Sequence, residues 1–590
     1  MKIKTNWNLG LFYKNEDDPQ IEKDVQSIEK LFADFEKKYG STRTYLSNES
    51  ALHKTLTDFE TLQEKASWKP LMYLHYATDL NSANEKAEAL KSKLTQRLVT
   101  ASNKIVFFTL ALVTIKPTLQ KKFLKSKKLA HFHYFLKVLF DTSKHNLTEA
   151  EEKILNIKYL PSHGLWVDGV QKLVSKQTVQ FEGKTISLPE AIGKIPQLNV
   201  KKRRALHDKV MASLKNISDF PESEINALYT DKKSMDELRQ FEKPYSATIL
   251  AYQNDEQSVM NLVKTVTDGF TISADFYNLK SKLLKTSQLE YADRAADIGD
   301  QHKKVPFEKG LDLFKRSLTK IPSPLYSKIF ETFMDEGRID VYPQKGKRGG
   351  AYCSSDIGTP TMVLLNYTDS LDSVMTLGHE MGHGFHAELS KRQKPLYQDH
   401  TISVAEVAST FFENIVFEEI FETLTDKEKI IALHDRLNDD VSTIFRQIAC
   451  FNFELELHET IRKEGFLSKE KIAALHNKHM SAYLGPKVTL KENDGYFFVN
   501  WMHIRSFFYV YSYAYGQIIS KALYKKYQED KKFIFQIEKF LSAGSSKSPE
   551  DIFKEIGIDT SKPEFFKAGL EQVKSDLIRL EKLAKSAKLI

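Results

Sequence analysis

Apolar residues recur every three or four positions along most of the chain, which is the spacing of a helix with one buried face. The stretch VQSIEKLFADFEKKY, within residues 20–140, is an example, with its apolar positions at Val25, Ile28, Leu31, Phe32 and Phe35. Further along, Thr148 stands three residues before Glu151, a capping-box spacing that predicts the start of another helix. The helical spacing resumes after residue 371 and continues over most of the remaining sequence.

Two segments alternate instead in the manner of β-strands. VQFEGKTISL at 179–188 predicts a small hairpin, and RGGAYCSSDIGTPTMVLLNYT at 348–368 predicts two short strands joined by a loop with glycine and proline. Glycine accounts for 24 of the 590 residues and proline for 17, both below the usual shares of about 7% and 5%. The expected fold is therefore mostly α, with a small β region.

Length and charge limit the classes of protein that fit. A chain of 590 residues is too long for one ordinary core, so we expect several domains or one large helical body divided into lobes. The net charge is +8, with 86 basic and 78 acidic residues interspersed. This pattern indicates a solvated surface rather than a nucleic-acid-binding one.

The chain also lacks the usual signals of an extracellular or membrane protein. Cys353 and Cys450 are its two cysteines, too few for a disulfide framework and suited to a reducing compartment. The segment MKIKTNWNLGLFY has no apolar core of a signal peptide. The apolar run IVFFTLALVTI at 105–115 is shorter than the roughly 18 residues of a membrane span. It predicts a buried helix, and we expect a cytoplasmic protein with no membrane partner.

The segment LGHEMGHGFH, residues 377–386, concentrates metal-binding chemistry. His379 and His383 are four positions apart, so on a helix both imidazoles lie on one face and can bind a single metal ion. Imidazole nitrogens supply two corners of a tetrahedral zinc site, and Glu380 can reach a metal-bound water without being a ligand. The alternative is a helix with half-buried histidines satisfied by ordinary hydrogen bonds.

Three glycines in this segment, Gly378, Gly382 and Gly384, argue against that alternative. Together they weaken a helix by roughly 2–3 kcal/mol relative to alanine, so a compensating gain is expected. Close approach of a neighbouring backbone to the metal-binding helix would supply it. His386, one turn beyond His383, is expected to lie beside the ligands without binding the metal.

A third ligand is needed, because a catalytic zinc site has three protein ligands and one open position. The apolar-rich segment SVAEVASTFFENIVFEEIFE at 403–422 carries Glu406 and Glu413 on one helical face, two turns apart. Unpaired buried carboxylates are unfavourable, so pairing with imidazoles or metal would explain them. We interpret Glu406 as the third ligand and Glu413 as a partner that orients an imidazole. The alternative is that both face solvent.

Taken in order, these motifs resemble those of the thimet-oligopeptidase-like (M3) zinc metallopeptidases. HEMGHGFH is followed by AEVAS, whose glutamate comes 27 residues after His379. RIDVYPQKGKRGGAYC, FYVYSYAYG, FLSAGSSKSPEDIFKEIGID, LTEAEEKIL and NWNLGLFY resemble the oligoendopeptidase F branch of that family. The resemblance implies a mostly α-helical fold in which two helical lobes enclose a deep substrate channel, with a small β-sheet beside the HExxH helix.

The resemblance also implies an activity and a division of the chain. It implies a zinc endopeptidase that hydrolyses internal bonds of short, unstructured peptides, with one zinc ion per chain. Its metal ligands fall on His379, His383 and Glu406, and its general base on Glu380. Residues 1–200 would form an N-terminal helical region that includes an oligoendopeptidase F-type domain at about 115–185. Residues 201–590 would form the catalytic domain.

GGAYC resembles the strand on which the substrate lies in this family. Gly349, Gly350, Ala351 and Tyr352 would bind an extended peptide by main-chain hydrogen bonds, with the glycines leaving room for its backbone. The alternative is an ordinary hairpin edge. Cys353 is expected to be a packing residue rather than a nucleophile.

WMHIRSFFYVYSYAYGQ places His503 ahead of a predicted helix that carries four tyrosines. Tyr509 and Tyr513 share one face of that helix, and Tyr511 and Tyr515 share another. In the family, a histidine and tyrosines of this segment donate hydrogen bonds to the developing oxyanion, and we favour His503, Tyr509 and Tyr513 here. The alternative is that the tyrosines belong to the core.

Other functions remain open on the sequence alone. Within the peptidase class, the runner-up is an exopeptidase that removes terminal dipeptides. A non-catalytic helical protein that binds peptides would keep the motif as scaffold. A basic nucleic-acid-associated protein would lose binding steeply with added salt.

Overall fold

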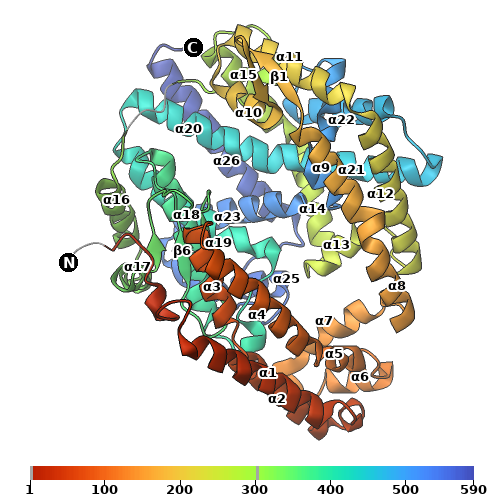
Figure 1. Ribbon diagram of the computed structural model, residues 1–590. Coiled ribbons are helices and arrows are strands. Elements are labelled where there is room, and N and C mark those ends of the chain that lie inside the picture. The colour runs from red at the N-terminus through yellow and green to blue at the C-terminus, as the bar shows by residue number, and fades with distance from the viewer. Residues whose placement is uncertain (1–3, 300–303) are drawn as a thin grey trace. The chain divides into compact units, whose positions relative to one another are not determined.

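Helices make up most of the chain and the sheets are small, which confirms the mostly α fold class (Figure 1). The computed structural model describes residues 4–299 and 304–590. Its described residues form two compact units, each assembled from three segments of the chain. Unit 1 is drawn from Met1–Lys144, His302–Glu422 and Lys526–Ile558, and unit 2 from His145–Gln301, Thr423–Lys525 and Asp559–Ile590.

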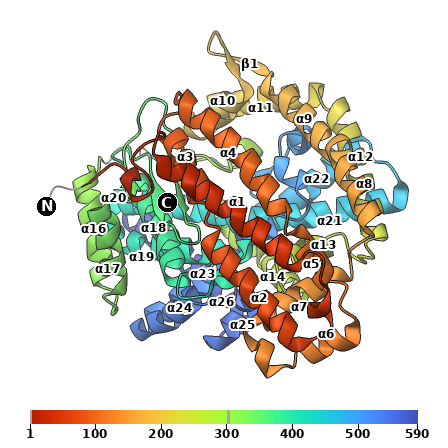
Figure 2. The ribbon, with the colours of Figure 1, turned by 60° about the horizontal axis from the view of Figure 1, so that its bottom comes forward.

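Unit 1 contains the N-terminal helices and the segments predicted to bind metal. Its helices are α1 Pro19–Tyr39, α2 Glu49–Lys65, α3 Lys69–Leu80, α4 Glu85–Asn103, α5 Val106–Leu112, α6 Pro117–Phe123, α7 His133–Ser143, α16 Phe307–Thr319, α17 Leu325–Glu336, α18 Leu371–Ser390, α19 Ile402–Glu422, α24 Ile534–Leu541 and α25 Pro549–Glu555. Its strands are β4 Ile339–Asp340, β5 Tyr352–Ser354 and β6 Met362–Leu364. In Figure 2 the red to orange helices α1, α2, α3 and α4 lie together, in agreement with their contacts.

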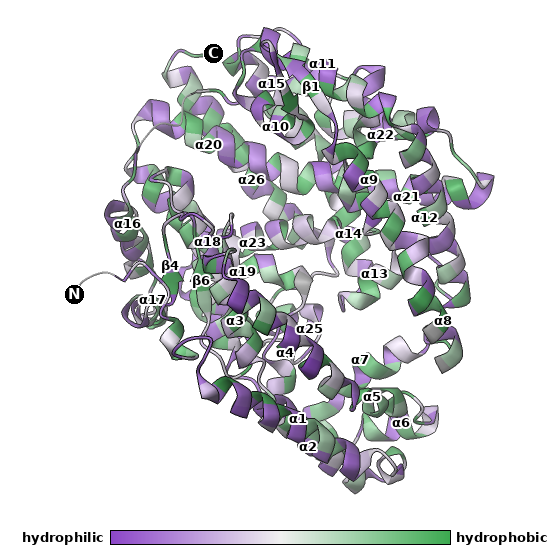
Figure 3. Cartoon of the chain, in the orientation of Figure 1, coloured by the Kyte–Doolittle hydropathy of each residue, from purple (hydrophilic) through white to green (hydrophobic). Residues whose placement is uncertain are grey.

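The helices of unit 1 bury the faces that the apolar spacing predicts. In α1, Val25, Ile28, Phe32 and Phe35 are buried, whereas Leu31 is half-buried. Hydrophilic and hydrophobic residues interleave along the helices in Figure 3, as expected for helices with one buried face. The helix begins where the Asp18 side chain accepts a hydrogen bond from the Gln20 N–H, which satisfies one of the free donors at its start.

The predicted pair of short strands at 348–368 is present in unit 1. β5 pairs antiparallel with β6, Tyr352 opposite Leu364, and β4 pairs parallel with β6 on the other side. β5 is thus at an edge of the three-stranded sheet β4-β6-β5. The Trp7 Nε1–H donates to the Val363 carbonyl oxygen at 2.8 Å, which ties the N-terminal segment to this sheet.

Unit 2 is also helical. Its helices are α8 Glu149–Tyr159, α9 Leu165–Ser175, α10 Leu188–Lys194, α11 Val200–Asn216, α12 Asp219–Leu238, α13 Ser246–Ala251, α14 Glu256–Asp268, α15 Phe270–Leu283, α20 Asp426–Asp440, α21 Arg446–Glu464, α22 Lys469–Leu484 and α26 Pro563–Ser586, with most of α23 Tyr511–Glu529. Its strands are β1 Thr178–Phe181, β2 Lys184–Ser187, β3 Leu289–Glu290 and β7 Val488–Thr489.

Two local predictions in unit 2 are confirmed. Thr148 and Glu151 form the predicted capping box at the start of α8. The predicted hairpin consists of β1 and β2, and its turn residues Glu182 and Gly183 both have positive φ, as a two-residue hairpin turn requires. The parallel pair β3 and β7, two residues per strand, was not predicted.

The apolar run at 105–115 is helical over α5. Phe108 and Leu112 are fully buried there, whereas Val106 and Leu110 are about half exposed. Among the described residues, no single helix has the length and apolar character of a membrane span. Two consecutive helical stretches, Glu85–Leu112 and Pro117–Phe123, have that length and apolar character when taken together, and the chain bends by 101° between them.

Candidate metal centre

Helix α18 carries both predicted metal-binding histidines in unit 1. It begins after Ser370, whose hydroxyl accepts the Ser373 N–H at 3.1 Å. The rings of His379 and His383 lie one turn apart with centroids separated by 5.0 Å. The i, i+4 spacing therefore places both imidazoles on the same side of the helix, as predicted.

Helix α19 packs against α18 because two glycines leave room for it (Figure 1). A Cβ built on Gly382 would lie 2.6 Å from the Ser409 Cα, and one on Gly378 would lie 2.9 Å from a methyl group of Val416. Around Gly384, the nearest atom would be 3.4 Å away, an ordinary contact. The predicted close approach of a backbone is confirmed at Gly382, whereas Gly378 accommodates the side chain of Val416 and Gly384 has no close neighbour.

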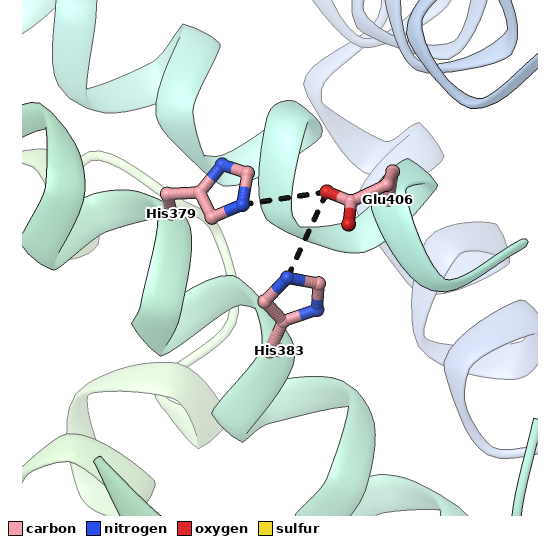
Figure 4. A group of neighbouring side chains, drawn as sticks. All are labelled: His379, His383 and Glu406. Carbon is pink, nitrogen blue, oxygen red and sulfur yellow. Dashed lines mark ion pairs between the residues drawn. The ribbon is translucent and has the colours of Figure 1, made fainter. Parts of the chain in front are cut away.

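Glu406 of α19 reaches the two histidines (Figure 4). Its Oε2 lies 3.3 Å from the His379 Nε2 and 3.7 Å from the His383 Nε2. One donor atom from each residue lies within 4.8 Å of the others, as three ligands around one ion require. The Ser409 hydroxyl donates to the same Glu406 oxygen at 2.9 Å and fixes its orientation. Two imidazoles and a carboxylate form a donor set that suits a catalytic zinc site.

The two residues predicted to support the ligands have different surroundings. The Oε2 of Glu413 lies 3.1 Å from the His379 Nδ1, which leaves Nε2 facing Glu406. His386 is 1% exposed and stacks on His400 with ring centroids 4.0 Å apart. The Glu413 contact is of the kind that orients a metal-binding imidazole, whereas His386 packs against a second ring.

The pKa values of the three ligand residues place one proton on His379 near neutral pH. Burial lowers the pKa of His379, but hydrogen bonds to Glu406 and Glu413 outweigh it and raise that pKa to about 10. Burial would raise the pKa of Glu406, but the His379 hydrogen bond and the charges of both histidines lower it to about 2. Burial lowers the pKa of His383 to about 4. A metal ion that binds these residues near neutral pH must therefore displace one proton, from His379.

Glu380 is placed next to the ligands on the buried side of α18. It is 6% exposed, and burial raises its pKa to about 7 despite the opposing charge of His379. The backbone N–H of Cys353 in β5 hydrogen-bonds to its carboxylate. A carboxyl group with a pKa near 7 can take up and release a proton near neutral pH. Burial also raises the pKa of the Cys353 thiol, which suits a packing residue better than a nucleophile.

A cavity opens at these residues within unit 1. Strand β5 lines it with Tyr352, Cys353 and Ser354, and Ala351 just before the strand also lines it, whereas Gly349 and Gly350 do not. A Cβ on either glycine would meet nothing within 4 Å. The Tyr352 hydroxyl donates to Asp79 of α3 at 2.5 Å, which anchors the strand. Of the predicted strand GGAYC, residues 351–353 thus line the cavity that also contains the metal ligands.

The predicted tyrosine helix begins later than expected. Helix α23 starts at Tyr511 in unit 2, so Tyr509 lies in the turn before it. Phe507 and Phe508 have φ of 42° and 60°, a left-handed backbone that interrupts the helix. The Thr248 hydroxyl donates to the Phe507 carbonyl oxygen at 2.8 Å. The correction concerns the helix start, and the physical reason is this left-handed pair, held by tertiary hydrogen bonds.

The predicted grouping of the four tyrosines into two pairs is confirmed by their burial, although Tyr509 precedes the helix. Tyr511 and Tyr515 are fully buried, whereas Tyr509 and Tyr513 are partly exposed. The His503 Nε2 lies 3.3 Å from the Tyr513 hydroxyl, and the Tyr509 and Tyr513 rings are 5.2 Å apart. The structure therefore brings His503, Tyr509 and Tyr513 together within unit 2.

Other residues of the metal-site cavity were not singled out from the sequence. Asp356 follows β5, and Asp399 and His400 precede α19. Asp356 lies inside the segment 348–368 that was predicted to hold two strands and a loop, which is the one sequence signal that could have identified it. The loop at Asp399 and His400 carries no such signal, because only the packing of α18 against α19 brings it to the cavity.

Comparison with known proteins gives matches along nearly the whole chain. The family model described as Peptidase family M3 matches residues 199–572, and the model described as Oligopeptidase F matches residues 112–168. The oligoendopeptidase F homolog of Borreliella burgdorferi is 28% identical over 96% of this chain and 97% of that protein. Oligopeptidase PepF of Bacillus subtilis is 24% identical over 100% of this chain and 88% of that protein.

Solved structures share the fold. A putative peptidase from Chlamydophila abortus has a TM-score of 0.88 at 21% identity and covers 98% of each chain. Oligoendopeptidase-F from Enterococcus faecium has a TM-score of 0.68 at 18% identity, covering 96% of this chain and 99% of that one. These likenesses support the mostly helical fold.

Proposed function

Since this chain belongs to peptidase family M3, we propose that it is a metalloendopeptidase in which His379, His383 and Glu406 hold one zinc ion. The substrates are short unstructured peptides, cut at internal bonds, in keeping with relatives named oligoendopeptidase F and oligopeptidase. The observation that carries the proposal is the convergence of two imidazoles and one carboxylate within 4.8 Å, from two helices packed through glycine.

The chemistry divides between the ion and the residues around it. A bound zinc ion would polarise the scissile carbonyl and lower the pKa of the attacking water. Glu380 takes a proton from that water and passes it to the leaving nitrogen, which its raised pKa of about 7 favours. The N–H of Cys353 holds the Glu380 carboxylate in place, and Glu413 keeps the His379 Nε2 directed toward the ion.

The edge strand β5 supplies the binding surface for the peptide. Its hydrogen-bonding partner β6 lies on one side only, so an extended peptide can add on the other by main-chain hydrogen bonds. Ala351 and Tyr352 face the cavity, and the open space at Gly349 and Gly350 admits a second backbone.

The proposal also includes hydrogen-bond donors for the developing oxyanion. His503, Tyr509 and Tyr513 take that role because the resemblance to the family assigns it to this segment. Their mutual proximity supports the assignment: His503 lies 3.3 Å from the Tyr513 hydroxyl. Such donors act when they are preorganised around the charge that develops in the transition state.

Other parts of the proposal rest on the sequence. The division into residues 1–200, with a domain at about 115–185, and residues 201–590 stays a prediction, as does the substrate channel between helical lobes. A cytoplasmic location, and the absence of nucleic-acid and membrane partners, are proposed from the charge pattern and the two cysteines.

Product mapping tests the proposal. A mixed library of short peptides, half of them blocked at both termini, is incubated with the zinc-loaded protein, and the products are identified by mass spectrometry with and without a chelator. We expect internal cleavage of blocked and free peptides alike, abolished by the chelator and restored by zinc. Cleavage confined to free termini would indicate the dipeptide-releasing exopeptidase. Binding without any cleavage would indicate a peptide-binding protein.

A further inference from the structure

The left-handed pair Phe507 and Phe508 lies between His503 and the tyrosines in the chain. Both residues have positive φ, 42° and 60°, a conformation that is sterically unfavourable for residues with a bulky side chain. Such strain persists only where surrounding groups hold it, and it concentrates at functional sites. Because the turn separates His503 from Tyr509, its backbone angles set how these two side chains meet. A group that fixes the turn therefore also fixes their geometry.

Glu454 of α21 holds this turn through its backbone. Its Oε1 accepts the Phe508 N–H at 2.9 Å. The Phe508 ring is fully buried and lies against Phe451 and His458 of the same helix, with ring centroids 5.0 and 5.1 Å away. The ring contacts fix where the Phe508 side chain lies, and the hydrogen bond fixes the direction of its peptide group.

The Glu454 carboxyl group is costly to bury. Its side chain is fully buried, and its Oε2 has no hydrogen-bond partner among the described residues. Burial raises its pKa to about 8, while the Phe508 N–H lowers it, so the group is mostly protonated at neutral pH. A buried carboxyl group with an unsatisfied oxygen is destabilising. An apolar side chain would avoid that cost but could not hold the Phe508 N–H.

The side chains that follow the turn have a defined arrangement. The Tyr509 ring lies 6.1 Å from the His503 ring at 14°, and 5.2 Å from the Tyr513 ring at 89°. Tyr513 belongs to α23, whereas Tyr509 lies in the turn before that helix. Helix geometry therefore places Tyr513, and the left-handed turn places Tyr509.

We propose that Glu454 is a positioning residue for the reaction: by accepting the Phe508 N–H, it holds the left-handed turn that places Tyr509. The inference rests on the proposed function, since it takes Tyr509 as a hydrogen-bond donor to the developing oxyanion. Glu454 is fully buried and acts through Tyr509 rather than on the substrate. The alternative is that Glu454 contributes only to the stability of unit 2.

Two substitutions of Glu454 test the role of the hydrogen bond. Glu454→Leu removes the acceptor, and kcat should fall about 10–100-fold with KM changed less than about twofold, because a misplaced donor affects the transition state. Glu454→Gln keeps an oxygen that can accept the Phe508 N–H and should restore most of that loss. Ile448→Ala, which leaves a cavity on the same helix, is the control for stability. It should lower the unfolding temperature and keep kcat.

A double-mutant cycle tests whether Glu454 acts through Tyr509. In the Tyr509→Phe protein, which already lacks the donor, adding Glu454→Leu should lower kcat less than about threefold. Equal losses in both backgrounds would show a structural role only and overturn the inference. A wild-type kcat in Glu454→Leu or in Tyr509→Phe would overturn it as well.

A spectroscopic readout does not depend on turnover. 3-Fluorotyrosine incorporated at position 509 reports the surroundings of that ring through its fluorine resonance. The resonance should shift in Glu454→Leu and stay in place in Glu454→Gln and Ile448→Ala. An unchanged resonance in Glu454→Leu overturns the inference even where activity is lost. If the zinc-loaded wild-type protein cleaves no peptide, the proposed function fails, and the resonance alone decides whether Glu454 positions Tyr509.

Discussion

Replacing Gly382 with alanine should disrupt the metal site while leaving every ligand in place. The added Cβ would lie 2.6 Å from the Ser409 Cα and 2.9 Å from the Ala408 carbonyl oxygen. Both are backbone atoms of α19, so no side chain can rotate away. The helices must separate by about 0.8 Å to restore an ordinary contact of 3.4 Å. Because His383 follows Gly382 on one helix and Glu406 lies on the other, this movement separates two ligands.

The size of the effect follows from the tolerance of metal coordination. The distances between a metal ion and its ligands vary by only about 0.2 Å. The movement of about 0.8 Å between the two helices is several times larger. Displaced supporting groups typically reduce metal affinity 10–100-fold, and we expect a loss of at least this size. Stability should change less, because overpacking by about 1–3 kcal/mol is partly offset by the roughly 1 kcal/mol that alanine adds to a helix.

Gly384→Ala is the matched control on the same helix. Its Cβ would meet the Phe333 ring at 3.4 Å, so it should keep wild-type zinc affinity and gain up to about 1 kcal/mol of stability. Zinc affinity is measured by competition with a fluorescent chelator, and stability by thermal unfolding of the zinc-free proteins. If Gly382→Ala binds zinc within threefold of wild type, the close approach of the helices does not set the ligand geometry and the reasoning is wrong.

Three further predictions concern the chemistry. Glu380→Gln should retain zinc, as measured by metal analysis, and its kcat should fall by about 10²–10⁴-fold. Turnover near the wild-type rate would show that Glu380 is not the general base. Tyr513→Phe should lower kcat by about 10²–10³-fold with little change in KM. Tyr511 is buried on the other face, so Tyr511→Phe should change kcat far less. Equal effects of the two substitutions would indicate that both phenols only pack in the core. Zinc binding should release one proton from His379, whose pKa is about 10. Zinc affinity should therefore rise about tenfold for each pH unit between roughly pH 6 and 8. Calorimetry in buffers of different ionisation enthalpy measures the number of protons released, and a zinc affinity that does not change with pH contradicts the prediction.

The helices could be predicted because local rules and tertiary packing agree in them. The apolar face of α1 and the capping box at Thr148 are local patterns, and the structure contains both. The strands of β3 and β7 have two residues each, too few to leave an alternation in the sequence. The start of α23 could not be predicted either, since the left-handed turn at Phe507 and Phe508 is held by hydrogen bonds from distant helices.

The residues of the candidate site could also be predicted only where a local sequence pattern marks them. The histidines of α18 follow from a four-residue spacing, and the two glycines that adjoin α19 follow from their cost in a helix. Asp356 and Asp399 have no shared sequence pattern, because the cavity that unites them is formed by a strand end and a loop 43 residues apart. Only the packing of α18 against both β5 and α19 brings them to one cavity.

The interleaved construction of the two units has a consequence for biosynthesis. Helix α18 packs against α24, and Gln393 donates to the Ser542 carbonyl oxygen at 2.7 Å. In unit 2, Ser258 hydrogen-bonds to Thr560. A ribosome makes these segments after the earlier segments of the same unit, at about 5–20 residues per second. Neither unit can complete its core before its own last segment is made, so the apolar helix faces of both units stay uncovered in the nascent chain until then.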